Sequence, residues 1–144
     1  MFEKLFTLVK DNAGMAVINN PQIAVKDQEA VIIEASSSII EVLKGQVESG
    51  KLKDLIKYFQ FPDIYNNPLI HTTVNKFANK LNNYYGIEPL VASHVAKGLI
   101  TPVMQELMHQ STEKNNDFAL NKLLGNISGN TQRMQQLLDQ LAIA

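Results

Sequence analysis

Histidine and carboxylate side chains are the groups of this chain that could carry acid–base or metal chemistry, so their spacing decides what chemistry to expect. His71, His94 and His109 fall on separate predicted helices, and neither His71 nor His94 has a carboxylate or a second histidine three or four residues away. A metal site needs three or four convergent ligands. We therefore interpret the three histidines as surface or partly buried residues and expect no metal site.

Nucleophilic catalysis and phosphate binding have equally little support. The triplet Ser36–Ser38 could be combined with His71 or His94 and with Asp63 into a serine triad, but no G-x-S-x-G elbow positions a serine. Glycine-rich phosphate loops are also absent from the sequence. We predict no catalytic residue and no cofactor, which favours a non-enzymatic protein. Four glutamates on the polar side of one predicted helix are interpreted as a solvated face: Glu29, Glu34, Glu41 and Glu48.

Composition narrows the function further. The 144 residues carry 13 Lys and Arg against 14 Asp and Glu, a net charge of −1, and Arg133 is the only arginine. This balance argues against a nucleic-acid-binding protein, so the basic side formed by Lys51, Lys53 and Lys57 is interpreted as solvated. Cysteine is absent, and no apolar run reaches the roughly 18 residues of a membrane span. Charges interrupt the N-terminal apolar positions, so we expect no secretion signal and a cytoplasmic location.

The apolar residues recur at helical spacing throughout the chain. The pattern predicts an all-α fold, a single compact multi-helical domain over residues 1–144 with seven or eight helices and no confident strand. The expected helices cover Phe2 to about Ile18, Asp27–Ser49, Lys51–Gln60, Pro68–Tyr85, about Glu88 to Met108, a short helix Phe118–Gly125 capped by Asn116 or Asp117, and a last helix over about 130–142, with a polar loop expected over 109–117.

Turn and cap residues set the expected ends of these helices. The side chains of Asp27 and Asn67 are predicted to cap the helices that follow them, and Pro68 suits a first helical position. Gly50 and Gly86 are predicted to end helices in the left-handed conformation.

Pro102 is predicted to interrupt the helix that contains it. It has no N–H to donate to the carbonyl of Gly98, and its ring crowds that carbonyl. The segment is expected either to kink there or to break into two helices, with Thr101 capping the second.

Several stretches of the sequence resemble the YidB-like bacterial family of unknown function. The resemblance spans Phe2 to about Gly129 and rests on four stretches: LFTLVKDNAGMAVINNPQI, EASSSIIEVLKGQVESGKLKDLIKYF, NKFANKLNNYYGIEPLVASHVAKGLITPVMQELMHQ and FALNKLLGNISG. It implies a small multi-helical bacterial fold and brings no activity, cofactor or site residue. Residues 130–144 form a Gln- and Leu-rich segment that departs from the glycine-rich end of that family.

Two functions remain open from the sequence. The first is a non-catalytic domain for protein–protein interaction or self-association, with an unknown protein partner or a homodimer. Its candidate face is the stripe of the C-terminal helix, residues 130–144: Met134, Leu137, Leu138 and Leu141. The alternative is a small-molecule or lipid-binding domain with a cavity lined by aromatic residues, namely Phe59, Phe61, Tyr65, Phe77, Tyr84 and Tyr85.

Overall fold

Helices make up most of the chain that the computed structural model describes, which is residues 2–60, 63, 66–113 and 117–128. Within these ranges there is no strand, so the predicted all-α, multi-helical fold is confirmed. The predicted helix over 130–142 and its apolar stripe lie outside the described residues. The elements are α1 (Phe2–Asp11), the π-helical turn η1 (Gly14–Ile18), the 3-10 turn η2 (Val25–Asp27), α2 (Gln28–Glu48), α3 (Leu52–Gln60), α4 (Pro68–Tyr85), α5 (Pro89–Gln110) and α6 (Leu120–Ser128).

α4 and α5 form a helical hairpin whose ends follow the predicted signals. The Asn67 side chain accepts a hydrogen bond from the Leu69 amide at 3.0 Å, and Pro68 occupies the first turn. Gly86 adopts the left-handed conformation, with φ of 64°, and ends α4. Asn67 also donates to the carbonyl of Tyr58 at 3.2 Å, which ties the start of α4 to α3.

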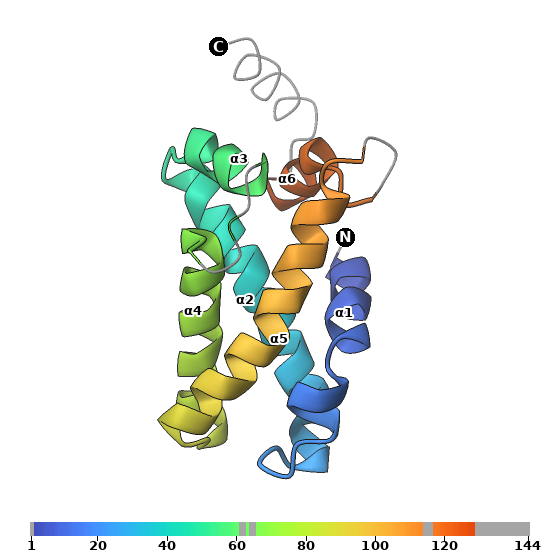
Figure 1. The fold of residues 1–144 in the computed structure, drawn as a ribbon, viewed down its shortest axis with the longest axis vertical. Coiled ribbons are helices and arrows are strands. Elements are labelled where there is room, and N and C mark those ends of the chain that lie inside the picture. Colours follow the sequence, from blue (N-terminus) through green and yellow to red (C-terminus); the bar gives the residue numbers. More distant parts are fainter. Residues whose placement is uncertain (1, 61–62, 64–65, 114–116, 129–144) are drawn as a thin grey trace.

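The hairpin packs on α2, the central helix of the fold. α2 and α5 cross in the middle of the molecule, with α4 on one side and α1 on the other, while α3 and α6 are both at the upper end (Figure 1). Ser36, Ser38 and Thr73 are buried, and each donates its hydroxyl proton to a carbonyl one turn earlier in its own helix. Such internal bonds let polar side chains lie in an apolar core.

The N-terminal helix ends earlier than the sequence predicts. α1 stops at Asp11, and the chain continues through a short turn into η1 instead of running as one helix to Ile18. The Asn12 side chain donates to the Leu8 carbonyl at 2.8 Å, and Val17 and Ile18 both donate to the carbonyl of Ala13. A π-helical turn holds more residues than an α-helical turn. In this turn Val17 is buried and Met15 faces outward.

Pro102 does not divide α5. The helix is continuous from Pro89 to Gln110, so a break into two helices with Thr101 as a cap is wrong. The physical reason is burial on both sides of the proline, because a break would expose apolar surface that the rest of the core covers. The fully buried residues around it are Leu99, Ile100, Val103, Met104 and Leu107.

Local signals also mislead at three other positions. Asp27 makes no capping bond with its side chain, because it lies in η2 with φ of −100° and ψ of −7° rather than in an extended conformation. Asp117 does not cap α6: its carboxylate pairs with Lys4 at 2.7 Å, and α6 begins at Leu120. Gly125 is buried inside α6 and does not end it.

Candidate functional site: the surface around α5

The side chains of the serine triad considered from the sequence do not come together. Ser36 and Ser38 are buried and donate to their own helix, while Asp63 is exposed and accepts a hydrogen bond from Asn66 at 3.3 Å. Among the described residues, no group of three His, Asp or Glu side chains is placed to hold a metal ion. The arrangement offers no activated nucleophile.

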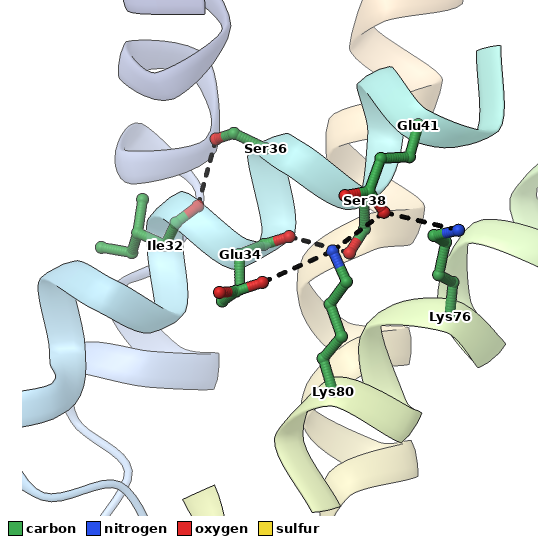
Figure 2. Close-up of polar contacts among 7 residues, drawn as sticks. All are labelled: Ile32, Glu34, Ser36, Ser38, Glu41, Lys76 and Lys80. Atoms are coloured by element: carbon green, nitrogen blue, oxygen red, sulfur yellow. Dashed lines mark hydrogen bonds and ion pairs between the residues drawn. The ribbon is translucent and has the colours of Figure 1, made fainter. Parts of the chain in front are cut away.

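A charged network joins α2 to α4 at the edge of the core. Lys80 reaches from α4 between two glutamates of α2, 3.0 Å from the Glu41 carboxylate and 3.4 Å from that of Glu34 (Figure 2). Lys76 lies 3.4 Å from the same Glu41 oxygen. The sequence predicted that Glu34 and Glu41 belong to a freely solvated face. In the structure both are paired with lysines of α4 instead. The Lys80 side chain is only 14% exposed, so this network fixes the relative position of the two helices.

Two lysines control the ionisation of Glu41. Partial burial raises the pKa of its carboxyl, but hydrogen bonds and charges from Lys80 and Lys76 outweigh burial and hold the pKa below the ordinary value of 4.5. A carboxyl whose pKa is lower in the folded state stabilises the fold above its unfolded-state pKa. That stabilisation is lost as the pH falls through the folded-state value.

We expect acid to weaken the α2–α4 contact through this carboxyl. The free energy of unfolding should fall as the pH drops below 4.5, and the fall should be smaller for Glu41→Gln than for wild type, because glutamine has no carboxyl to protonate. Urea unfolding at pH values above and below 4.5 measures the difference. Glu48→Gln is the matched control on α2, because its exposed carboxylate lies 3.9 Å from Lys44. Identical pH dependence in wild type and Glu41→Gln would contradict the assignment.

A polar pocket of about 770 Å³ opens between α1, α3 and α5. Its lining includes His109, Asp11 and Glu106. Glu106 precedes His109 by one helical turn, and this spacing in the sequence places the two side chains on the same face of the helix. Glu106 accepts a hydrogen bond from Gln110 at 2.7 Å. No lysine or arginine is among the described residues that line this pocket, so its wall lacks the strongly basic side chains that an anion site uses.

Two hollows flank the first half of α5, and both are more apolar than the polar pocket. The α4 hollow, about 550 Å³, lies against α4, and the η1 hollow, about 570 Å³, lies against η1. The α4 hollow is lined by Ile70, His71, Val74, His94, Lys97, Gly98 and Thr101, and the η1 hollow by Met15, Ala16, Asn20, Val91, His94, Val95 and Gly98. The structure thus brings His71 and His94 to one depression, which the sequence did not predict, and no carboxylate lines either hollow.

Gly98 lines both hollows, as does His94. A β-carbon added there would find only the Ala16 β-carbon, at 3.8 Å, so packing does not require glycine. Glycine inside a helix costs about 1 kcal/mol relative to alanine, and proline costs about 3 kcal/mol. Two residues that are unfavourable in a helix, Gly98 and Pro102, therefore lie one turn apart. Core packing does not explain why position 98 is a glycine.

Exposed apolar side chains adjoin this region. Met15 is 89% exposed at the η1 hollow, and Leu90 is 72% exposed beside Val91 on α5. We call the two hollows together with Leu90 the α5 surface. Large apolar groups left open around a concave apolar surface are typical of a protein-binding site.

The aromatic residues proposed to line a cavity are dispersed among the described elements. Phe77 is fully buried in the core, Phe59 is buried at the wall of the polar pocket, and Tyr84 is 69% exposed rather than inward. Tyr85 is partly buried against the core, and Phe61 and Tyr65 lie outside the described residues.

No protein-family model matches the chain, and no curated protein and no solved structure is significantly similar to it. Among the described helices, none combines the length and the apolar character that crossing a bilayer requires.

Proposed function

We propose that this protein is a non-catalytic helical domain that self-associates, with the α5 surface of one copy receiving the C-terminal helix of another. The observation that carries the proposal is the pair of apolar hollows that share Gly98, with Met15 almost fully exposed at their edge. Apolar grooves of this kind receive the apolar face of an amphipathic helix.

The occupant is suggested by the chain itself. Residues 130–142 carry a predicted stripe of four apolar side chains, Met134, Leu137, Leu138 and Leu141, that needs an apolar surface. Lys97 and two histidines line the α5 surface without any acidic group. The segment carries one acidic side chain, Asp139 beside its stripe, and one basic side chain, Arg133 at its start, so the apolar stripe rather than net charge suggests it as the occupant. Reciprocal docking in a two-fold dimer would cover both stripes, and such dimers are the commonest homo-oligomers.

We further propose that the protein is bacterial and of the YidB-like kind, which rests on the resemblance of the sequence alone. The proposed cytoplasmic location rests instead on the charges within its N-terminal segment and on the absence of cysteine. A lipid or small molecule is the competing occupant of the same hollows. It would bury an alkyl chain against Val91 and Val95 rather than a helix.

Replacing Met15 with glutamate tests the proposal. We expect Met15→Glu to weaken the dimer by about tenfold or more, because a carboxylate buried in an apolar interface loses its hydration without gaining a partner. Sedimentation velocity across a range of protein concentrations measures the dissociation constant. Since the side chain is 89% exposed, the thermal midpoint should change little.

Val25→Glu is the matched control, because Val25 is 81% exposed, lies outside both hollows and receives the same charge. A wild-type chain that stays monomeric at high concentration would overturn the proposal. A fatty acid or other small molecule that co-purifies with wild type and is lost from Met15→Glu would assign the surface to the competing occupant.

A further inference from the structure

We infer that the main-chain carbonyl of Gly98 is a hydrogen-bond acceptor that the docked helix must satisfy with a donor of its own. The inference rests on the proposed function and deepens it, because it names the polar contact that selects the occupant of the α5 surface. Pro102 lies inside α5, and the helix continues through it from Pro89 to Gln110.

Pro102 removes the usual donor. In an α-helix the carbonyl of residue 98 accepts a hydrogen bond from the amide of residue 102, but proline has no N–H. Because α5 continues through the proline, the Gly98 carbonyl lies in the middle of a helix without that bond. Such a carbonyl is normally satisfied by water or by another donor.

Gly98 places main-chain atoms at both hollows. It has no side chain, so the atoms through which it lines them belong to the main chain, and the residue is exposed. A β-carbon added at this position would meet only that of Ala16, at 3.8 Å, so the space beside the Gly98 α-carbon is open. A partner that covers the hollows excludes water from them and leaves an unpaired acceptor unless it supplies a donor.

The C-terminal segment of a second copy is rich in such donors. Amide side chains accompany its apolar stripe, and Asn130 precedes Met134 by one helical turn, in line with the stripe. An amide NH₂ group donates two hydrogen bonds. A purely apolar occupant, such as an alkyl chain, would leave the acceptor unpaired, so the Gly98 carbonyl favours this segment over a lipid.

Pro102→Ala tests the inference, because alanine restores an amide that pairs with the Gly98 carbonyl inside the helix. We expect the thermal midpoint to rise and the dimer to dissociate about three- to tenfold more readily, as the docked donor loses its acceptor. A gain in stability combined with weaker association is not expected from a residue that only shapes the fold. Sedimentation velocity and thermal unfolding of the full-length chain measure the two effects.

Pro89→Ala is the matched control, because a proline at the start of α5 leaves no helical carbonyl without its donor. It should change neither the dissociation constant nor the response to Met15→Glu. A Pro102→Ala chain that associates as tightly as wild type, or more tightly, overturns the role of the carbonyl. If Met15→Glu still separates the copies in that case, the proposed function stands without it. If neither substitution changes the association, both fail.

Discussion

Phe77→Ala should lower the free energy of unfolding by about 3–5 kcal/mol, the range found when a fully buried aromatic side chain is removed from a packed core. Phe77 is 0% exposed and lies on α4, in the core between α2 and α5. The loss combines the transfer of the ring out of the core with the cavity that it leaves. Urea unfolding followed by circular dichroism gives the free energy.

Tyr84→Ala provides the control on the same helix, since it also removes an aromatic ring. Its side chain is 69% exposed, so we expect a change within about 0.5 kcal/mol. Comparable losses from both substitutions would show that Tyr84 packs against something that the described surface does not reveal, and would contradict its assignment as a surface residue.

Deletion of residues 130–144 should convert a dimer into a folded monomer. The proposed interface loses its inserted helix, while the core of the described residues keeps its own contacts, so the thermal midpoint should fall only modestly. Solution mass and thermal midpoint have to be measured together on the same sample.

The same deletion has a second informative result. A chain that is monomeric before and after the deletion, and that loses much of its thermal stability, would place Met134, Leu137, Leu138 and Leu141 in the core of a single copy. That result would remove the occupant of the α5 surface and with it the proposed dimer. Replacing all four of these side chains with polar ones should unfold such a chain.

Several signals that act over a few residues predicted the local structure correctly, although those at Asp27 and Gly125 did not. Asn67 and Pro68 begin α4, and Gly50 and Gly86 take the left-handed conformation that ends α2 and α4. Each of these outcomes depends on dihedral angles or on one hydrogen bond to a neighbour in sequence. The sequence therefore contains them without reference to the rest of the fold.

Positions decided by tertiary contacts were predicted less well. Pro102 stays inside α5 because buried side chains on both sides of it hold the helix together, and Asp117 pairs with Lys4 from the other end of the chain instead of capping α6. Lys80 likewise gathers Glu34 and Glu41 from α2, which periodicity alone assigns to solvent. None of these partners is near in sequence.

The candidate site was the least predictable feature. The α5 surface takes its walls from η1, α4 and α5, and no pattern within one of these segments indicates that they meet. One signal was nevertheless present in the sequence. Gly98 and Pro102 are the two poorest helix formers, one turn apart within a strongly apolar helix, and such a pair points to a position at which the backbone itself has a role.

The short connection between α4 and α5 also bears on the order in which the fold assembles. Only residues 86–88 separate these helices, which share the most extensive helix–helix contact of the described chain, so closing this hairpin costs little chain entropy. We therefore expect the α4 hollow to belong to an early folding unit. The η1 hollow should form later, because it needs a segment from near the N-terminus to dock on α5. Although η1 is synthesised first, the complete α5 surface exists only once α5 has emerged and folded, so the association that we propose would follow the folding of each copy.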